Sequence, residues 1–349
     1  MQALRKTRAA PGLSLLQVAP PPAPGPGEVT VRVSATGVCG TDLHIDAWTP
    51  SYEFVAPSLP VTVGHEFSGH VAACGAGVTA LQPGELVAVR PSVVCGRCEA
   101  CMADRHDDCV TRRGIGVTRD GAFAGLVNVP ARNCVPVPPD VDPVVAALAE
   151  PLTVSHEAVR TAGVAPGDRV LVVGPGNIGQ GIALFARAAG AGQVVVAGRG
   201  DAARLQVLRT MGFDDLVDLE EPGAQDRLAA LAGAGFDAVI EAAGAASAVE
   251  LGHRLLKPRG VLVIGGIHAR PVPLDLTLLV RRQQQVRGSY RAPESEWPRV
   301  VDFMRRHQDT LRLMVTHRVA LEQAAEGFAL ARERQATKVM VLPRPAVHA

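Results

Sequence analysis

A glycine pattern in the middle of the chain constrains the fold more than any other feature of the sequence. Its residues are Gly174, Pro175, Gly176, Asn177, Ile178 and Gly179, at the spacing G-x-G-x-x-G. They follow the apolar run 169–173, which is typical of a buried parallel strand, and they open the helix-like segment 178–189. In this context the first glycine permits a tight turn, the second a close approach of pyrophosphate, and the third close helix packing. The pattern therefore predicts a dinucleotide site at the start of this helix.

The segments around this pattern alternate between expected strands and expected helices. Further strands are expected at 193–197, 236–240 and 261–264, and helices at 202–211 and 246–256. Strands that alternate with helices in this way favour a parallel sheet with helices on both faces. The sequence therefore predicts an α/β fold with a doubly wound, Rossmann-type domain.

The segments before and after this region differ from it in composition and in expected secondary structure. At 349 residues the chain is long enough for two domains. Residues 1–153 are rich in Pro and Gly and contain short β-branched runs such as 29–33, which indicate strands and turns. Residues 290–349 hold helical stretches and a closing strand-like run at 338–342. We therefore expect a dinucleotide-binding domain at 154–289, inserted between two parts of a mostly β domain.

The second expected strand of the dinucleotide unit lacks the acidic residue that usually holds the ribose 2′-hydroxyl of NAD(H). It runs instead into Gly198 and Arg199, which leave room for a 2′-phosphate and supply a counter-charge. Asp201, in the following loop, could still reach a plain ribose. The sequence therefore favours NADP(H) over NAD(H) as the cofactor.

Four of the seven cysteines lie close together in the first part of the chain. At the spacing C-x2-C-x2-C-x7-C they are Cys95, Cys98, Cys101 and Cys109. Four thiolates at this spacing can bind one Zn²⁺ and leave no position for a substrate, so the predicted zinc is structural. Disulfides would need an oxidising compartment, and an iron–sulfur cluster of this spacing usually has a proline after its fourth cysteine. His106 lies in the same loop, but four thiols already complete a shell.

A second set of residues could hold a catalytic metal. Cys39 offers a thiolate, and the adjacent residues His65 and Glu66 offer an imidazole and a carboxylate. A catalytic zinc typically has three protein ligands and one exchangeable position. Cys39 and His65 are the expected first two ligands, and the third is either Glu66 or Glu150.

The residues around His65 resemble a known signature. The signature of the zinc-containing alcohol dehydrogenases is matched at each fixed position by Gly64, His65, Glu66, Gly69, Gly75 and Val78. Together with the cysteine loop and the glycine pattern, this makes the chain similar to the medium-chain zinc dehydrogenases from end to end. The resemblance implies a GroES-like, mostly β catalytic domain beside a Rossmann domain. A homodimer or homotetramer is also expected.

The resemblance implies roles for individual residues. In that family the positions matching Cys39 and His65 bind the catalytic zinc. The positions matching Glu66 and, in the polyol and threonine branches, Glu150 complete or adjust its shell. The position matching Thr41 bonds the reacting oxygen of the substrate.

Three further positions are assigned by the same resemblance. A residue near His44 passes the substrate's proton towards solvent, and Gly265 and Ile267 fall where backbone groups contact the nicotinamide. Residues 39–48 look most like the threonine dehydrogenase branch, whereas Ser92 stands where that branch tends to carry histidine. Threonine itself is therefore in doubt, and sorbitol and butanediol dehydrogenases share the residues around Glu150.

Zinc chemistry supports an alcohol as the substrate. An alcohol must lose its proton before its carbon can release hydride, and zinc lowers the pKa of bound water from 15.7 to roughly 7. A shift of about nine pKa units corresponds to about 12 kcal/mol, more than a positioned base alone supplies. The sequence therefore predicts a zinc-dependent oxidoreductase that transfers hydride between a small polar secondary alcohol (a polyol, a diol or a threonine-like substrate) and NAD(P).

Composition excludes other classes of function. A net charge of +1 gives no electrostatic support for nucleic-acid binding, and no run approaches the roughly 20 apolar residues of a membrane helix. A cytoplasmic protein without a membrane partner is expected.

Two alternatives to a zinc dehydrogenase remain. They are a zinc-free quinone or enoyl reductase of the same fold and a dinucleotide-binding zinc protein without turnover. Metal analysis would distinguish the zinc-free reductase from a zinc dehydrogenase. A turnover assay would distinguish the non-catalytic zinc protein from a zinc dehydrogenase.

Overall fold

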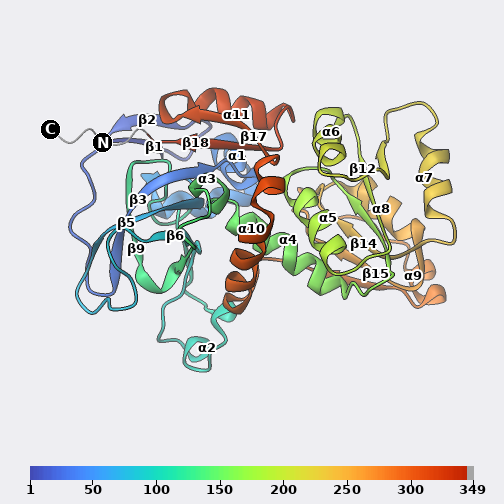
Figure 1. Ribbon diagram of the computed structural model, residues 1–349, viewed down its shortest axis with the longest axis horizontal. Helices are drawn as coiled ribbons and strands as arrows, with labels where there is room; N and C mark the ends of the chain where they lie inside the picture. The colour runs from blue at the N-terminus through green and yellow to red at the C-terminus, as the bar shows by residue number, and fades with distance from the viewer. Residues whose placement is uncertain (344–349) are drawn as a thin grey trace. The chain divides into compact units, whose positions relative to one another are not determined.

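The computed structural model describes residues 1–343, which fall into two compact units (Figure 1). The first unit comprises Met1–Glu150, Pro293–Glu333 and the described residues from Lys338 onward. The second unit comprises Pro151–Ala292 and the short segment Arg334–Thr337. The domain bounds expected from the sequence, 154–289, stay a prediction, and the sequence does not indicate that 334–337 returns to the second unit.

A parallel sheet forms the centre of the second unit. Among the described residues its strands lie in the order β13-β12-β11-β14-β15-β16. They are β11 (Arg169–Val173), β12 (Gln193–Gly198), β13 (Leu216–Asp218), β14 (Phe236–Glu241), β15 (Leu256–Ile264) and β16 (Gln285–Gly288). The order reverses at β11, which is the doubly wound arrangement, and the predicted α/β fold class is confirmed.

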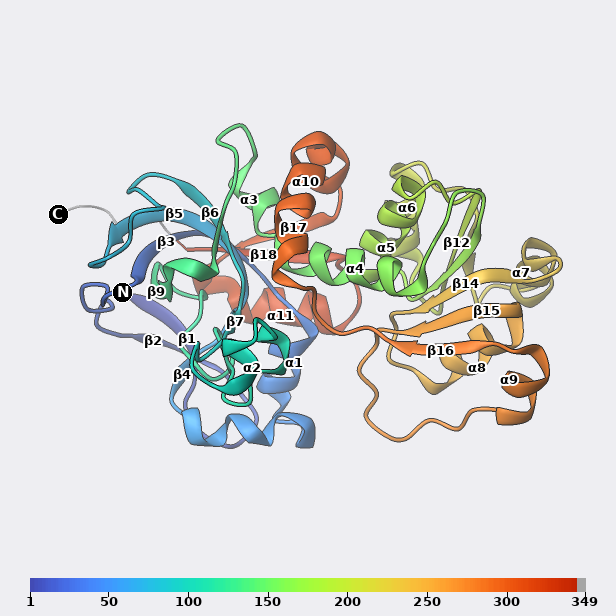
Figure 2. The ribbon, with the colours of Figure 1, turned by 90° about the horizontal axis from the view of Figure 1, so that it is seen from below.

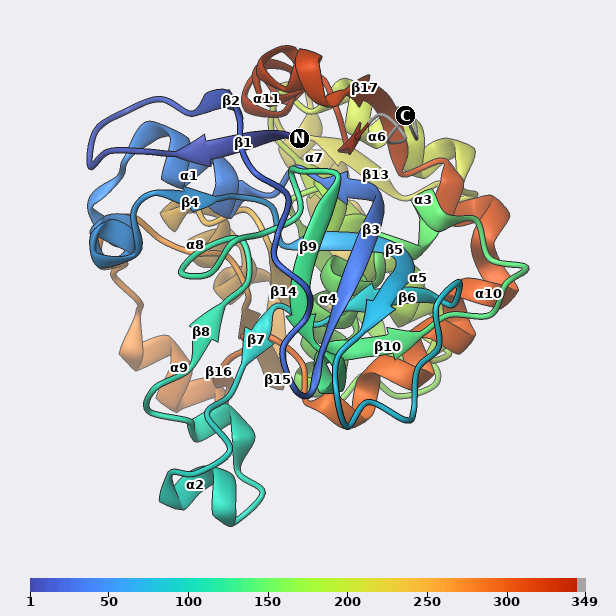
Figure 3. The ribbon, with the colours of Figure 1, turned by 90° about the vertical axis from the view of Figure 1, so that its left-hand side faces the viewer.

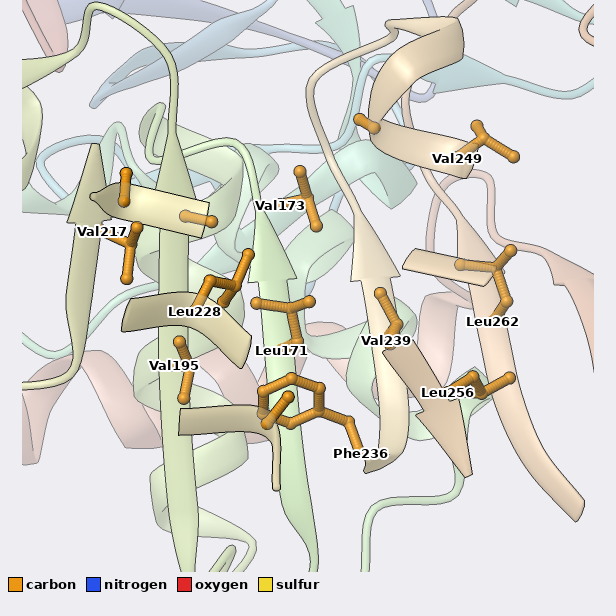
Figure 4. Packing of buried hydrophobic residues seen from close by; sticks show 14 residues of the cluster. Leu171, Val173, Val195, Val217, Leu228, Phe236, Val239, Val249, Leu256 and Leu262 are labelled. Carbon is orange, nitrogen blue, oxygen red and sulfur yellow. The ribbon is translucent and has the colours of Figure 1, made fainter. Parts of the chain in front are cut away.

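Helices cover both faces of this sheet. Figure 2 shows α5 and α6 on one face and α8 on the other. The helices are α4 (Ala149–Ala162), α5 (Asn177–Ala188), α6 (Ala202–Thr210), α7 (Ala224–Ala232), α8 (Ala246–Leu255) and α9 (Leu276–Arg282). In Figure 4, Leu171 and Val239 of the strands pack with Leu228 of α7 and Val249 of α8. Burial of strand residues on both faces explains why β11 is a continuous apolar run.

The first unit is built around a mostly antiparallel sheet. Its strands lie in the order β10-β6-β5-β3-β18-β17, and β9 also pairs with β3. In β3 (Glu28–Gly37), Gly37 lies opposite Glu66, the first residue of β5 (Glu66–Cys74). Gly37 also pairs with Met340 of β18 (Lys338–Leu342). This register brings the ends of β3, β5 and the last strand together.

The remaining strands and helices of the first unit surround this sheet. The strands are β1 (Gln2–Lys6), β2 (Ser14–Gln17), β4 (Val61–Thr62), β6 (Leu86–Val89), β7 (Ser92–Val93), β8 (Arg113–Gly114), β9 (Leu126–Pro130), β10 (Cys134–Pro136) and β17 (Val315–Ala320). The α-helices are α1 (Gly40–Ala47), α2 (Glu99–Met102), α3 (Pro143–Ala146), α10 (Trp297–Arg312) and α11 (Ala324–Arg332). Short 3₁₀ turns are η1 (Pro50–Ser58), η2 (His106–Asp108), η3 (Ala131–Asn133), η4 (Glu294–Glu296) and η5 (Leu321–Gln323).

The segment 94–112 between β7 and β8, here called the cysteine lobe, carries α2 and projects away from the sheet (Figure 3). No helix within residues 1–343 is long and apolar enough to cross a membrane.

Candidate functional site

Three side chains with metal-binding atoms meet where β3 ends and β5 begins. Cys39 is the residue before α1, and His65 and Glu66 lie at the start of β5. One potential ligand atom from each of the three lies within 4.8 Å of the other two. His65 and Glu66 are buried, and Cys39 is half-buried. The thiolate, imidazole and carboxylate that the sequence singled out are thus gathered in one place.

Asp42 contacts the backbone of Cys39 and the side chain of His65, and it was not assigned a role from the sequence. Its carboxylate is fully buried and accepts a hydrogen bond of 2.9 Å from the backbone N–H of Cys39. Its other oxygen lies 3.5 Å from Nδ1 of His65. A carboxylate on one ring nitrogen of a histidine orients the ring and leaves Nε2 for a metal.

Lys338 is a second residue that sequence reasoning missed. Its Nζ donates hydrogen bonds to Oε2 of Glu66 at 2.6 Å and to the carbonyl oxygen of Val38 at 3.0 Å. Gly37 makes this approach possible, since a Cβ at position 37 would collide with Oε2 of Glu66. Burial lowers the pKa of Lys338, but Glu66, Cys39 and Glu150 together outweigh burial and raise it overall. The ammonium therefore stays charged and holds one oxygen of Glu66.

Glu150 stands outside the group formed by Cys39, His65 and Glu66, although its charge acts on Lys338. It is the second residue of α4.

The donor set fits a metal cation. Burial raises the pKa of the Cys39 thiol, and the negative charge of Glu66 raises it further. Burial lowers the pKa of His65, but Asp42 and Cys39 outweigh it and raise the pKa well above its usual value. A cation bound among these groups would take the place of both protons, and one thiolate, one imidazole and one carboxylate suit zinc.

The predicted proton-transfer residues lie on α1 beside this group. The hydroxyl of Thr41 is 3.0 Å from the hydroxyl of Tyr52 in η1. The ring of His44 stacks on Tyr52 with centroids 5.4 Å apart. Nδ1 of His44 lies 3.3 Å from the hydroxyl of Thr49. Tyr52 thus contacts both predicted residues, which no spacing in the sequence indicated.

The four clustered cysteines converge within the cysteine lobe. One sulfur atom from each of Cys95, Cys98, Cys101 and Cys109 lies within 4.8 Å of the others. Backbone N–H groups of Cys95 and Cys98 point at sulfur atoms of the cluster. His106 lies beside Glu294 and Asp104 instead of joining the sulfur atoms.

The thiols of this cluster differ in pKa and therefore in how readily they lose the proton that metal binding displaces. Hydrogen bonds from Thr111 and from backbone N–H groups lower the pKa of Cys95 to about 5. Backbone hydrogen bonding lowers the pKa of Cys109, whereas burial raises the pKa of Cys101 to about 12. Four thiolates crowded together repel one another, so their joint deprotonation needs a cation such as Zn²⁺.

Each position of the G-x-G-x-x-G pattern favours glycine for a different geometric reason. Gly174 has a φ of +113°, in a region that side chains rarely adopt. Gly176 precedes α5, and a Cβ there would meet no atom within 4 Å, so this helix end is open to a ligand. A Cβ on Gly179 would collide with the carbonyl oxygen of Gly174. These are the properties that pyrophosphate binding requires of this turn.

The residues between these glycines complete the turn. Pro175 lines a cavity of about 310 Å³ together with Gly174 and Gly176. Asn177 is the first residue of α5, and the carbonyl oxygen of Ile178 accepts a hydrogen bond of 3.0 Å from Ser155.

The end of β12 lies in the same cavity, where Gly198 and Arg199 form part of the wall. Asp218, at the end of β13, accepts hydrogen bonds from the backbone N–H groups of Gly200, Asp201 and Glu220 at 2.8, 3.0 and 3.1 Å. Burial raises the pKa of Asp218, but these hydrogen bonds and the charge of Arg199 together outweigh it and lower the pKa overall. Asp218 thus fixes the loop that follows β12.

Replacing Asp218 by asparagine is expected to lower the free energy of unfolding by about 2 kcal/mol near pH 7, because the charged acceptor is lost. The folded pKa of Asp218 lies below the unfolded value, so its stabilisation is lost only as the pH falls through the folded pKa. Urea unfolding should therefore show a constant difference between the two proteins down to about pH 4. A difference that shrinks between about pH 7 and about pH 5 would contradict this role.

Gly265 and Ile267 lie in the loop after β15. Glu241, at the end of β14, accepts the N–H of Gly265 at its carbonyl oxygen and the N–H of Gly244 at its buried carboxylate. His268 also lies 3.3 Å from this carboxylate. The side chain of Ile267 is exposed. Glu241, to which sequence reasoning assigned no role, therefore joins the loops after β14 and β15.

Comparison with known families agrees with both halves of this arrangement. Residues 25–139 match the family model of the alcohol dehydrogenase GroES-like domain, and residues 177–306 match that of the zinc-binding dehydrogenases. The chain is 36% identical to an L-threonine 3-dehydrogenase of Saccharopolyspora erythraea over 345 residues, covering 98% of each protein. It is 32% identical to a sorbitol dehydrogenase of Halalkalibacterium halodurans, covering 98% of this chain and 99% of the relative.

Solved structures give the same assignment. A zinc-binding dehydrogenase of Sinorhizobium meliloti bound to NADP is 33% identical, with a TM-score of 0.86 over 98% of this chain and 99% of that one. The 2R,3R-butanediol dehydrogenase of Bacillus subtilis is 26% identical, with a TM-score of 0.86 over 98% and 99%. The resemblance predicted from the sequence is confirmed, and the chain belongs to the family of zinc-binding, NAD(P)-dependent alcohol dehydrogenases.

Proposed function

We propose that the protein oxidises a small polar secondary alcohol with NADP⁺, at a zinc held by Cys39, His65 and Glu66. The observation that carries the proposal is the convergence of these three donors within 4.8 Å, with Asp42 behind Cys39 and His65. The substrate class, a polyol, diol or hydroxy amino acid, is supported by the likeness to threonine, sorbitol and butanediol dehydrogenases. The preference for NADP⁺ is supported by Gly198 and Arg199 at the end of β12.

The residues on α1 would handle the substrate's proton. When bound, zinc supplies the charge that lets an alcohol ionise near neutral pH. The Thr41 hydroxyl accepts the alcohol's proton and passes on its own, and Tyr52 holds that hydroxyl at 3.0 Å. Beside these hydroxyls, Nδ1 of His44 lies 3.3 Å from the hydroxyl of Thr49, which lies 3.2 Å from the exposed hydroxyl of Ser51, so a proton that reaches His44 has a path to solvent. In this scheme Glu150 adjusts the charge around Lys338 and is not a permanent ligand.

A substrate panel tests the proposal. Polyols, diols and L-threonine are each offered with NAD⁺ and with NADP⁺, and formation of the reduced nicotinamide is followed by absorbance. Metal analysis of the same preparation should give about two zinc ions per chain. Reduction of NADP⁺ by at least one polar alcohol is expected. A zinc-free preparation that reduced quinones instead would assign the protein to the reductases of the same fold.

We also propose that the protein forms a homodimer or homotetramer in the cytoplasm. Among the described residues β16 forms an outer edge of the six-stranded sheet. Its Val286 is 41% exposed, and Leu276 and Val280 of α9 are 64% and 71% exposed. An open edge with apolar side chains favours pairing with a second copy. Light scattering that gave the monomer mass of 36.4 kDa would contradict the proposed oligomer.

The proposed cytoplasmic location is supported by the cysteines. Seven cysteines without disulfides are compatible with a reducing compartment.

A further inference from the structure

The cavity beside the glycine pattern has an unbalanced charge at one end. Besides the glycines, its lining includes four arginines and two acidic residues, which leaves two positive charges in excess. The charged residues are Arg199, Arg204, Arg254, Arg334, Asp201 and Glu250. The cavity lies wholly within the second unit. A ligand that fills it would therefore be anionic at this end.

Two of the four arginines are already neutralised. Arg204 forms an ion pair of 3.2 Å with Asp201 and donates from Nε to the carbonyl oxygen of Ala336 at 2.9 Å. Arg254 forms an ion pair of 3.3 Å with Glu250. Within residues 1–343, no acidic side chain lies within ion-pair distance of Arg199 or Arg334. The excess positive charge therefore belongs to Arg199 and Arg334.

Arg334 occupies a backbone position that favours glycine. It follows the end of α11 with a φ of +60°, in the left-handed region where helices commonly end on glycine. A side chain in this conformation costs about 1 kcal/mol relative to glycine. Glycine could therefore replace Arg334 without backbone strain, so that the variant removes the guanidinium and leaves the turn intact.

The segment that carries Arg334 is fixed to the second unit. Ala336 receives the hydrogen bond from Arg204, and the hydroxyl of Thr337 receives one of 2.8 Å from the buried Gln180 of α5. Nη1 of Arg334 lies 3.5 Å from the carbonyl oxygen of Arg199. Two unpaired guanidinium groups are thus brought to the same end of the cavity from residues 135 apart in the sequence.

We infer that Arg334 binds the 2′-phosphate of NADP(H) together with Arg199, and that Arg204 positions the segment carrying Arg334. A phosphomonoester carries a charge of about −1.5 to −2 near pH 7, which matches the excess of two positive charges. A plain ribose would leave Arg334 without an anionic partner and Arg199 with only the longer-range attraction of Asp218. The inference rests on the proposed dinucleotide cleft but not on zinc or on the identity of the alcohol.

Calorimetric binding of two small probes to the whole protein tests this inference without any turnover. Adenosine 2′,5′-bisphosphate carries the 2′-phosphate, and adenosine 5′-monophosphate (AMP) differs from it only in lacking that group. The variant Arg334→Gly removes the guanidinium while relieving the backbone, so its melting temperature should be unchanged or raised. It should bind the bisphosphate about 10- to 100-fold more weakly and AMP with less than about a twofold change.

Arg259→Gly is the matched control, because Arg259 also has a positive φ of +64° but does not line the cavity. It removes the same charge and relieves the same kind of strain, and it should leave both affinities unchanged. Equal weakening of both probes by Arg334→Gly would overturn the assignment of Arg334. Equal wild-type affinities for the bisphosphate and AMP, or a preference for AMP, would overturn the 2′-phosphate site and leave the dehydrogenase function standing. Failure of both probes to bind the wild type would overturn the dinucleotide cleft itself.

Discussion

Replacing Cys39 by serine is expected to lower kcat/KM for the alcohol by about 10³-fold or more and to remove one of the two zinc ions. A serine hydroxyl stays protonated where a thiol can ionise, so it is a poor ligand for zinc. The His65 and Glu66 donors that remain cannot complete a three-ligand site. Without the metal an alcohol keeps its proton near neutral pH, which removes up to about 12 kcal/mol of stabilisation of its ionised form.

The same variant should still bind the dinucleotide. The glycine pattern and Arg199 lie in the second unit, whereas Cys39 belongs to the first. Affinity for ADP should therefore change by less than about twofold. The matched control is Cys74→Ser, since Cys74 lies at the end of β5 in the same unit and belongs to neither metal-binding group of the described residues. If Cys39→Ser kept both zinc ions and turned over normally, the catalytic metal would have to lie elsewhere.

The fold could be predicted largely because its strands are buried on both faces. A strand such as β11 must be continuously apolar, and its bounds at Arg169–Val173 agree with the predicted run. The run at 338–342 likewise coincides with β18. By contrast β15 begins at Leu256, five residues before the predicted start, because its first part is partly exposed and polar. The segment 334–337 could not be assigned to the second unit, since four residues carry no periodicity.

The candidate site could be predicted where residue chemistry coincides with a family signature. Cys39, His65 and Glu66 offer a thiolate, an imidazole and a carboxylate, and the signature around His65 together with the cysteine loop made a shared metal site the expected interpretation. Lys338 does not stand out, since it lies 272 residues from Glu66 and reads as an ordinary strand residue. Tyr52 and Arg334 are likewise common surface types whose partners depend on the tertiary fold. Residues that contact the predicted site residues could therefore be identified only from the structure.

The cysteine lobe has little to hold it together besides its four sulfur atoms. Helix α2 has four residues, far below the roughly 12 that an isolated helix needs to be even marginally stable. Two of the lobe's larger apolar side chains, Met102 and Val110, are 74% and 82% exposed. The lobe contacts the rest of the first unit through Glu294, which lies near His106 and forms an ion pair of 2.8 Å with Arg90. We therefore expect a bound zinc to supply most of its stability.

Replacing Cys101 by serine is accordingly expected to unfold the lobe. Cys101 is buried in the cluster, with its sulfur 3.9 Å from that of Cys95. A structural zinc contributes about 10 kcal/mol or more to the folding of a small metal-dependent module, and three thiolates bind it far more weakly. Metal analysis should show one zinc instead of two, and trypsin should cut rapidly at lobe arginines such as Arg105.

The variants Cys101→Ser and Cys39→Ser should each lose a different zinc ion, which distinguishes the two metal sites. Cys101→Ser should keep the zinc at Cys39, so some turnover should survive, whereas Cys39→Ser should keep the lobe resistant to trypsin. Cys134→Ser is the control for losing a buried thiol, because Cys134 lies in β10 of the same unit and outside both metal-binding groups of residues 1–343. If Cys101→Ser retained two zinc ions and full resistance to trypsin, a metal-free packing of the lobe would explain its fold. The structural assignment of the four cysteines would then be wrong.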